Sequence, residues 1–569
     1  MKVGFFGTWE NRTNLVWYCR KEDDGTLYTL CWQSIDFPSP IVATIVVDLN
    51  RDGTLDILLQ CEDASLYVID GRNRDGLPVA INKASVPAFD ARIPQVSVVS
   101  VSSHCGLPDI ALVDEEGSLV LMRATTETSD GSCVGKGTPN FEPLVLFQGS
   151  KGVREVSPLS IASDDIDGDC AADLLYTVYQ VDKNSLDLYA FFTEMDTHVL
   201  LLTLQPANHY GLPSMVDVNG DGVADIVFPI CASDHDSVPF GECTQFDGIA
   251  VFYNDLRGSS SCSDDGCCKR HPYGFNENAS KVLLFETNRS CGIYTSAEMP
   301  LTMPSSLASP LLLRHGDYNR DGYIDLLVPS TYGPLLLTNT ANSNDVPFSC
   351  SPVDGNLAKA PHEKYPAYTN AVPFFVVLND RGRLDIVLTY HGGEALDVAI
   401  YMNHLSSLEQ NYFLISSTLN GAFNADAWGL YQPCAVHRFG WSDVSMHKRW
   451  AYATQLSRSQ GHALPSPRLL FGLGRTFSYV EYYTVGIVAE KRALIRQWSA
   501  HLVPNSNLFL WLNPLLSPGH WRLRLYLVDS AYQRLLLVVL STALGVIGIP
   551  IILLKWQEVR QDRRELKFR

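Results

Sequence analysis

Residues 48–56 read DLNRDGTLD, and the same nine-residue pattern recurs as DIDGDCAAD at 165–173, DVNGDGVAD at 217–225 and DYNRDGYID at 317–325. Each copy lies between two short apolar runs, as with TIVV before the first copy and ILL after it. Apolar runs bounded by Asp, Asn and Gly are typical of buried strands joined by a tight turn. Every copy is therefore predicted to be a loop between two strands.

Weaker copies of the pattern fill the gaps between the four strong ones. VSSHCGLPDIALV keeps only Asp109, VVLNDRGRLDIVL keeps Asn379 and Asp385, and residues 8–14 resemble a shortened relic. The seven units recur mostly every ~40–65 residues, which is the size of a four-stranded propeller blade with its loops. We therefore predict an all-β chain in which residues 1–405 form a seven-bladed β-propeller, with a cysteine-rich insertion at about 230–310.

The acidic and amide residues of the four loops have the spacing of a calcium site. Oxygen ligands at positions 1, 3, 5 and 9, with a backbone carbonyl at position 7, suit a hard cation, and several carboxylates in one turn repel each other without one. A glycine at position 6 of three loops allows the left-handed backbone that such a turn needs, whereas the second loop has Cys170 there. The alternative is a set of solvated turns. We expect up to four structural Ca²⁺ ions, with the ligands Asp48, Asn50, Asp52, Asp56, Asp165, Asp167, Asp169, Asp173, Asp217, Asn219, Asp221, Asp225, Asp317, Asn319, Asp321 and Asp325.

The repeat stops after about residue 405, and a different organisation follows. Strand-like stretches predict a smaller, sandwich-like β-domain over residues 406–530. Residues 535–554 carry no charge and are long enough for a helix to cross a bilayer, so we expect a transmembrane helix at 533–555. The tail at 556–569 is basic, and the positive-inside tendency places it in the cytoplasm. This describes a type I single-pass protein of the plasma membrane or secretory pathway.

The N-terminus and the cysteines bear on the compartment of the large domain. The first residues contain no apolar run long enough for a signal peptide, which would fit a tail-anchored protein facing the cytosol. We favour a processed or missing start, because Asn11, Asn278 and Asn288 begin glycosylation sequons. The 14 cysteines favour an oxidising compartment, and Cys231 with Cys243 is the expected disulfide.

Composition and motifs exclude several classes of function. A formal net charge of −19 argues against nucleic-acid binding. The chain contains no nucleophile elbow, phosphate loop, zinc-protease helix or dinucleotide fingerprint, so we do not expect an enzyme. The stretch HGGE at 391–394 has no accompanying nucleophile and is read as a turn. These observations favour a binding protein.

The four loops resemble the FG-GAP repeats of integrin alpha subunits, which bind calcium in a seven-bladed propeller. The unit count, the degenerate first, third and seventh units and the C-terminal span resemble the T-cell immunomodulatory protein (linkin) family of integrin-alpha-like membrane proteins. FGLGR at 471–475, LVPNS at 502–506 and WQE at 556–558 resemble the membrane-proximal part of that family. The FGLG segment is also similar to the small ASPIC/UnbV-type β-domain.

The resemblance implies a non-enzymatic cell-surface protein in adhesion or immune modulation. On this basis we expect a calcium-stabilised ectodomain that binds a protein partner at the cell surface. A carbohydrate-binding propeller is the first alternative, since the aromatic content of 10% would serve stacking on sugar rings. An intracellular tail-anchored scaffold is the second.

Overall fold

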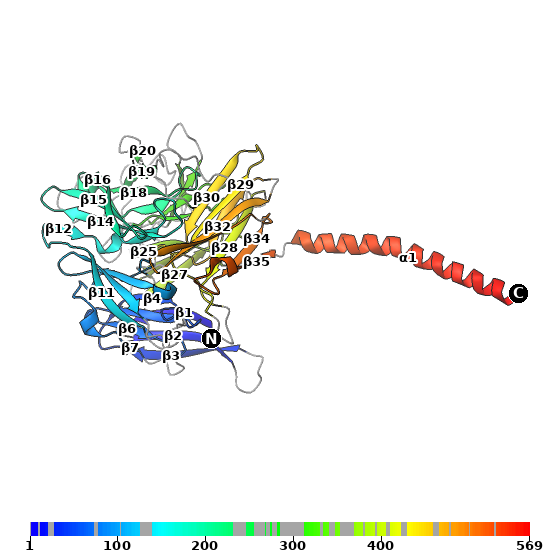
Figure 1. Ribbon diagram of the computed structural model, residues 1–569, viewed down its shortest axis with the longest axis horizontal. Helices are drawn as coiled ribbons and strands as arrows, with labels where there is room; N and C mark the ends of the chain where they lie inside the picture. Colours follow the sequence, from blue (N-terminus) through cyan, green and yellow to red (C-terminus); the bar gives the residue numbers. More distant parts are fainter. Residues whose placement is uncertain are drawn as a thin grey trace.

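The computed structural model of the protein describes most of the chain. The described residues are 2–9, 12–20, 28–72, 78–102, 104–125, 139–231, 246–254, 268, 273–275, 281–284, 312–329, 334–340, 348–352, 369–378, 382–392, 395–405, 410–422, 429–458, 466–476, 479–499, 501–527 and 531–568. Figure 1 shows a globular body of β-sheets from which one long helix leaves.

The strands up to Tyr401 form antiparallel sheets that each use consecutive segments of chain. The first two sheets contain β1 (Lys2–Trp9), β2 (Arg12–Arg20) and β3 (Tyr28–Asp36), then β4 (Ile41–Val47), β5 (Asp56–Cys61), β6 (Leu66–Ile69) and β7 (Val79–Ala80). The next two contain β8 (Ser97–Val99), β9 (Asp109–Val113), β10 (Leu119–Thr125) and β11 (Asn140–Phe147), then β12 (Arg154–Val156), β13 (Ala162–Asp164), β14 (Asp173–Gln180), β15 (Ser185–Phe192) and β16 (Thr197–Leu204).

The same up-and-down order continues in the following sheets. They contain β17 (Ser214–Val216), β18 (Asp225–Cys231), β19 (Phe246–Phe252) and β20 (Lys281–Leu284), then β21 (Arg314–Gly316), β22 (Asp325–Val328), β23 (Leu335–Asn339) and β24 (Phe348–Pro352), and finally β25 (Thr369–Val376), β26 (Asp385–Gly392) and β27 (Ala395–Tyr401). Short 3₁₀ helices connect some strands: η1 (Lys83–Ser85), η2 (His104–Gly106), η3 (Pro158–Ser160) and η4 (Ala207–His209).

The apolar cores lie between successive sheets, as in a propeller. One cluster joins the sheet of β4–β6 to that of β8–β10 through residues such as Leu58 and Leu112. Further clusters join β9 and β10 to β14, β14–β16 to β18 and β19, and β18 and β19 to β22 and β23. The sheets of β8–β11, β12–β16 and β17–β20 are therefore buried on both faces by their neighbours, which explains their near-continuous apolar strands. The β-propeller fold class is confirmed, while the number of blades stays a prediction.

The C-terminal part of the body is a two-layer β-sandwich. One sheet has the order β31-β28-β34-β35, from β31 (Leu469–Gly474), β28 (Tyr412–Leu419), β34 (Ser506–Trp511) and β35 (Arg522–Leu527). The other has the order β30-β29-β32-β33, from β30 (Lys448–Thr454), β29 (Val436–Ser442), β32 (Val480–Ala489) and β33 (Arg492–Trp498), and η9 (Pro518–His520) precedes β35. A core that includes Phe439, Tyr483 and Leu510 fills the space between the two layers.

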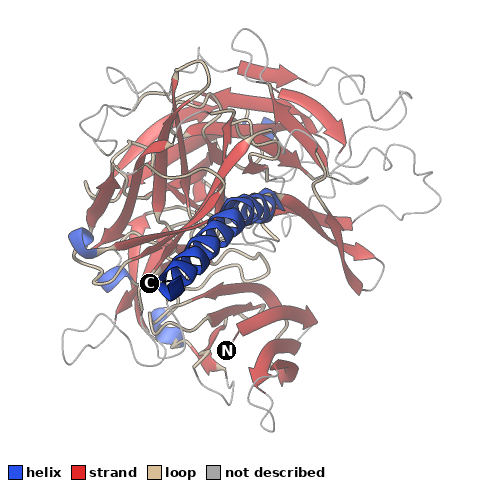
Figure 2. Ribbon diagram, turned by 90° about the vertical axis from the view of Figure 1, so that its right-hand side faces the viewer, coloured by secondary structure: helices blue, strands red, loops and turns tan. Residues whose placement is uncertain are grey.

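Helix α1 (Ala531–Phe568) follows the sandwich and projects away from the body, as Figures 1 and 2 show. It is long and apolar enough to cross a membrane. The predicted span at 533–555 lies within this helix, but helical structure continues through the basic tail to Phe568. Pro550 lies inside the helix without ending it.

A buried aspartate begins the second strand of most propeller sheets and holds the loop in place. It is the ninth residue of the repeat, and it is fully or almost fully buried in each described copy: Asp56, Asp109, Asp173, Asp225, Asp325 and Asp385. In the strong copies its Oδ2 accepts the N–H of loop position 2, as from Leu49 to Asp56 (2.9 Å). Its Oδ1 accepts an N–H at the end of the next strand, as from Gly71 to Asp56 (3.1 Å). The carboxylate therefore ties the loop to the third strand of its own sheet.

Three asparagines extend this bond to the neighbouring sheet. The N–H groups of Asn254, Asn339 and Asn403 donate to the position-9 aspartates of their own sheets over 2.8–2.9 Å. Their side-chain amides donate to the carbonyl at loop position 2 of the preceding sheet, over 2.8–3.0 Å. Position 9 therefore connects successive sheets as well as the strands of one sheet.

We predict that Asp109→Ala lowers the free energy of unfolding by roughly 3 kcal/mol, because at least two buried N–H groups lose their acceptor. Asp109 accepts from the buried N–H groups of Val101 (3.3 Å) and Ala124 (3.2 Å), and its unit lacks the other acidic residues of the repeat. The loss should thus be the same with calcium and with chelator, measured by thermal unfolding. The exposed Asp182→Ala is the control, and a calcium-dependent loss at Asp109 would contradict this structural role.

Candidate calcium loops and the docked sandwich

The four strong loops share one conformation, which gathers their oxygen atoms. The position-1 aspartate accepts the N–H of position 6, over 3.0 Å in the first two loops and 2.8–2.9 Å in the others. The φ angle at position 6 is 80° at Gly53, 82° at Gly222 and 91° at Gly322, so the prediction of a left-handed backbone is confirmed. Cys170 has the same sign of φ, 63°, so the second loop keeps the turn without a glycine.

Burial raises the pKa values of several carboxylates in these loops. Burial and then the charge of Asp48 raise the pKa of Asp56 to about 8. Burial and the neighbouring Asp165 and Asp167 raise the pKa of Asp169 to about 8. For Asp217 and Asp317 burial, and then the carboxylate at position 5, raises the pKa well above its usual value. The protein thus concentrates carboxyl groups where burial disfavours their charged form.

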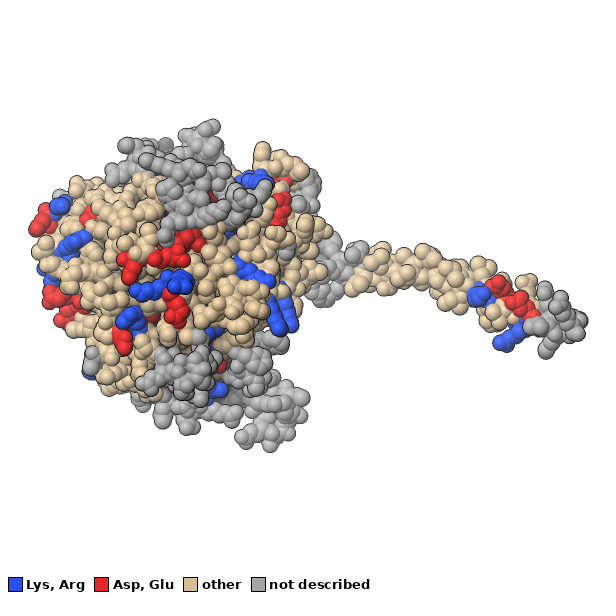
Figure 3. Space-filling view, in the orientation of Figure 1, with Lys and Arg blue, Asp and Glu red and all other residues tan. Residues whose placement is uncertain are grey.

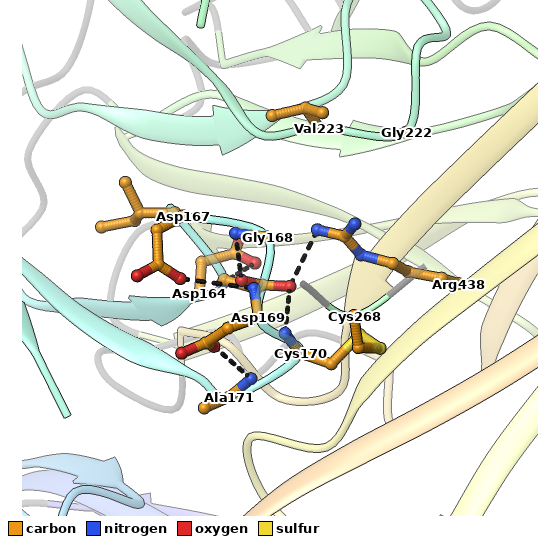
Figure 4. Close-up of polar contacts among 12 residues, drawn as sticks. Asp164, Asp167, Gly168, Asp169, Cys170, Ala171, Gly222, Val223, Cys268 and Arg438 are labelled. Carbon is orange, nitrogen blue, oxygen red and sulfur yellow. Dashed lines mark hydrogen bonds and ion pairs between the residues drawn. A yellow bond between two sulfur atoms is a disulfide. The ribbon is translucent and has the colours of Figure 1, made fainter. Parts of the chain in front are cut away.

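The Asp165 loop is the most enclosed of the four. Oxygen atoms of Asp165, Asp167 and Asp173 lie within 4.8 Å of one another, and all three residues are fully buried. Arg438 reaches this loop from β29, with Nη2 2.9 Å from Asp165 Oδ2 (Figure 4). Cys170 forms a disulfide with Cys268, which ties the loop to the cysteine-rich insertion. The Arg438 guanidinium therefore supplies positive charge to this loop, and a disulfide bond holds the loop in place.

The sandwich lies directly on the loop-bearing side of the propeller. Asn420 Nδ2 donates to Asp48 Oδ2 (2.7 Å) at the first loop, and Arg438 binds the second. At the third loop a Cβ on Gly222 would lie 2.8 Å from Trp450 Cβ, and at the fourth a Cβ on Gly472 would lie 1.8 Å from Asp317 Oδ2. All four predicted calcium loops thus meet one domain.

Two arginines at loop position 4 strengthen this contact from the propeller side. Arg51 donates to the backbone carbonyls of Cys105 (3.2 Å) and Asn420. The Arg320 guanidinium lies 4.5 Å from the ring centroid of Phe413 in β28. An apolar cluster accompanies these bonds, in which Phe413 and Ile415 of the sandwich pack with Phe375 and Ile386 of the propeller.

The residues present fit calcium as the group that balances the loop charge. The donors are carboxylate and amide oxygens, which a hard cation prefers, and burial raises the pKa values of Asp56, Asp169 and Asp317 among them. The loops differ in access, because Asn50, Asp52, Asp167 and Asp169 are buried whereas Asn219 is exposed and Asp321 is half-buried. Ions would therefore reach the Asp217 and Asp317 loops more easily than the Asp48 and Asp165 loops. Calcium itself stays a prediction.

Comparison with known sequences identifies relatives of this chain. A family model described as "ITFG1, C2 domain" matches residues 427–526, which cover most of the sandwich. The T-cell immunomodulatory protein of Macaca fascicularis is 30% identical over 290 residues, which are 46% of this chain and 88% of that protein. This chain belongs to the T-cell immunomodulatory protein family.

Other members of the family match different shares of the chain. The rat protein is 31% identical over 46% of this chain, and the match spans 45%, about half, of the rat protein's own length. The homologue of Plasmodium yoelii yoelii is 24% identical over 99% of this chain and 88% of its own. Among solved structures, an N-acetylglucosamine-recognising Agrocybe aegerita lectin aligns with a TM-score of 0.37, 13% identity and coverage of 79% of this chain and 96% of its own.

Several predicted site residues lie outside the described residues. These are the sequon asparagines Asn11, Asn278 and Asn288, and also Cys243. Cys231 is buried and disulfide-bonded, but its predicted pairing with Cys243 is not tested. The sixteen predicted calcium ligands are all described, and each set of four lies in one loop as expected.

Sequence reasoning missed the residues that link the loops to other parts of the fold. The bridging residues Asn254, Asn339 and Asn403 lie at or just after the end of the third strand of the next sheet and carry no local motif. Arg438 and Asn420 lie more than 270 residues from their aspartates, with separations of 273 and 372 residues. The only local signal was Cys170, which stands where the other three loops have glycine.

We predict that the stabilisation by calcium grows between pH 5.5 and pH 8.5. In chelator the pKa of Asp56 and of Asp169 is raised to about 8 in the folded state, from 3.8. Stability from such groups is full below their ordinary pKa and is lost as pH rises through the folded pKa. The metal-depleted protein should thus weaken with rising pH, and calcium should suppress the loss. The measurement is the difference in melting temperature between calcium and chelator at each pH.

Taking this difference cancels the titration of other groups, such as the buried His437, whose pKa burial lowers to about 3. Magnesium serves as the ion control, because its stricter octahedral geometry should restore stability poorly. A difference that stays constant or shrinks as pH rises would contradict charge balance by calcium.

We predict that Gly472→Ala loosens the sandwich from the propeller and costs about 2 kcal/mol or more, because the new Cβ meets Asp317 Oδ2 and the Arg320 backbone, at 1.8 and 2.6 Å. Hydrogen exchange should increase in the Asp317 loop and in β28. Gly519→Ala is the matched control, since a Cβ there meets nothing within 4 Å. Equal exchange in the two variants would show that the domains do not depend on this contact.

Proposed function

We propose that this chain is a non-enzymatic cell-surface adhesion or immunomodulatory protein, with a calcium-stabilised propeller ectodomain that binds a protein partner. The observation that carries the proposal is the meeting of all four acidic loops with the sandwich, at Asp48, Asp165, Gly222 and Asp317. The charge balance in these loops therefore affects the contact between the propeller and the sandwich. The names of the family members support a role in immune modulation.

Calcium acts indirectly in this proposal. Each ion would be held by the carboxylates and amides at positions 1, 3, 5 and 9, and it would balance their buried charge. With the loops rigid, the propeller keeps one orientation relative to the sandwich and to α1. A preorganised surface loses less entropy when a partner binds. Binding to the folded state alone adds about 2.7 kcal/mol per site at a hundredfold excess of calcium over its Kd.

The membrane topology is part of the same proposal. Helix α1 anchors the protein in the bilayer, and its basic end lies in the cytoplasm. The propeller and sandwich then face the lumen or the exterior, where free calcium is plentiful and disulfides persist. The Cys170–Cys268 bond agrees with that compartment.

A buried hydrogen-bond network around His437 in the sandwich contains the residue types of a hydrolase site. Its side chains are closed off from solvent, so a substrate could not reach them. Ser416 Oγ lies 2.8 Å from His437 Nδ1 and 2.8 Å from the hydroxyl of Tyr483. All three side chains are fully buried in the sandwich. Burial also lowers the pKa of His437 to about 3, so the ring is a neutral hydrogen-bonding group. The network supports packing of the sandwich and not catalysis.

We predict that Asp317→Ala/Asp321→Ala in the full-length protein lowers both the melting temperature in calcium and the attachment of cells that display it. Both substitutions remove oxygen ligands from the loop that meets Gly472. Attachment to T cells is compared in calcium and in chelator, with surface biotinylation of intact cells to normalise display. Chelator should abolish most attachment by the wild type and change the variant little.

Asp182→Ala, on an exposed turn, is the control and should leave melting and attachment unchanged. Absence of the large domain from the biotinylated fraction would contradict the topology. The role of calcium would be contradicted if chelator changed neither the attachment nor the melting curve of the wild type.

A further inference from the structure

The sandwich presents a face of aromatic and arginine side chains beside the root of α1. This aromatic–arginine face consists of Phe509 and Trp511 on β34 and Arg522, Arg524 and Tyr526 on β35. Side chains alternate along each strand, and Leu508, Leu510, Leu523 and Leu525 point the other way, into the sandwich core. The face is open, since both arginines are exposed and Tyr526 is 47% exposed.

Contacts within the face hold its side chains as one surface. Arg524 pairs with Phe509 across the two strands, and its guanidinium lies 5.5 Å from the centroid of the Trp511 ring. Phe509 and Tyr526 meet edge to face, with centroids 5.7 Å apart. In the described sheet β35 is the edge strand, bonded on one side to β34. Strand β35 reads RLRLYL and carries no acidic residue, in a chain whose net charge is −19.

The position of the face relative to the membrane span is constrained by the chain. Strand β35 ends at Leu527 and α1 begins at Ala531. Four Cα steps cover at most ~14 Å, and the helix from Ala531 to the apolar run at Leu535 rises about 6 Å. The end of β35 is therefore within about 20 Å of the hydrocarbon edge. Figure 1 shows β34 and β35 beside the root of α1, and Figure 3 shows Lys and Arg side chains on the body close to it.

We propose that the aromatic–arginine face contacts the phospholipid headgroups of the bilayer that α1 crosses. Trp and Tyr favour the membrane interface, where their rings are partly buried and their polar groups stay hydrated. Arginine binds phosphate through two parallel hydrogen bonds. The exposed Leu527, at the end of β35, adds an apolar contact. This contact fixes the height and tilt of the ectodomain above the membrane, which a helix linked by a short segment does not determine.

The inference rests on the proposed membrane anchoring by α1, and the experiment separates the two. The full-length protein is reconstituted in phosphatidylcholine nanodiscs, with the photo-cross-linking amino acid p-benzoylphenylalanine in place of Tyr526. Val145 is the control position, because it is 49% exposed and lies on β11, on the far side of the body from α1 in Figure 1. Co-elution of protein with nanodiscs reports anchoring, and mass spectrometry reports lipid adducts.

We expect lipid adducts at Tyr526 and not at Val145. Arg522→Glu/Arg524→Glu should lower the adduct yield at Tyr526 about fivefold, because the carboxylates repel the headgroup phosphates. Lys83→Glu/Lys151→Glu changes the same charge at two exposed propeller residues and should not affect the yield. All variants should melt as the wild type does, since each changed side chain is exposed.

Three outcomes would overturn the proposal while anchoring is intact. These are equal lipid adducts at the two positions, adducts at Tyr526 only with a second copy of the chain, and a yield that ignores Arg522 and Arg524. Failure of the protein to enter nanodiscs would instead overturn the anchoring by α1, and the headgroup contact with it.

Discussion

The carboxylate at position 9 of the repeat is the interaction on which the rest of the propeller depends. A buried aspartate is costly unless its oxygens accept several hydrogen bonds, so its presence constrains the surrounding backbone. In the sheet of β17–β20, Asp225 takes N–H groups from Val218 in its own loop and Asn254 after the third strand. The Asn254 amide then binds the loop of the preceding sheet. Loop shape, strand register and contact between sheets are thereby satisfied together.

This dependence explains why the third and seventh units keep an aspartate at position 9 although they lack the carboxylates at positions 1 and 5. Asp109 remains in a unit that has lost positions 1, 3 and 5, and Asp385 remains in a unit that keeps only Asn379 of those three. Both are fully buried, and both accept a backbone N–H from the end of the following strand. The aspartate at position 9 therefore stabilises the fold in every such unit. The carboxylates at positions 1, 3 and 5 repel one another, and a cation or a residue of the neighbouring domain must balance their charge.

Each of the four loops contacts the docked sandwich, and the Asp48 and Asp165 loops are buried beneath it. Arg438 balances part of the charge at Asp165, while Asn420 offers only a neutral amide to Asp48. Glycines on both sides permit this close approach, as at Gly222 beneath Trp450 and at Gly472 above Asp317. A domain seated over buried carboxylates is sensitive to their ionisation, since electrostatic interactions strengthen where water is excluded. The contact through which the propeller is held to the sandwich, and so to α1, therefore depends on the ionisation of the loop carboxylates.

The amino-acid sequence by itself determined the repeat, the strand-loop-strand unit, the sixteen Asp and Asn residues of the loops and the apolar helix. These follow from periodicity and turn chemistry over about ten to twenty residues, where local backbone preference is decisive. The tertiary structure alone decided that Arg438 and Asn420 meet Asp165 and Asp48, that Cys170 pairs with Cys268, and that the sandwich covers the loops. Those contacts join residues up to 372 positions apart. Their partners are chosen by the packing of whole sheets, which no local pattern encodes.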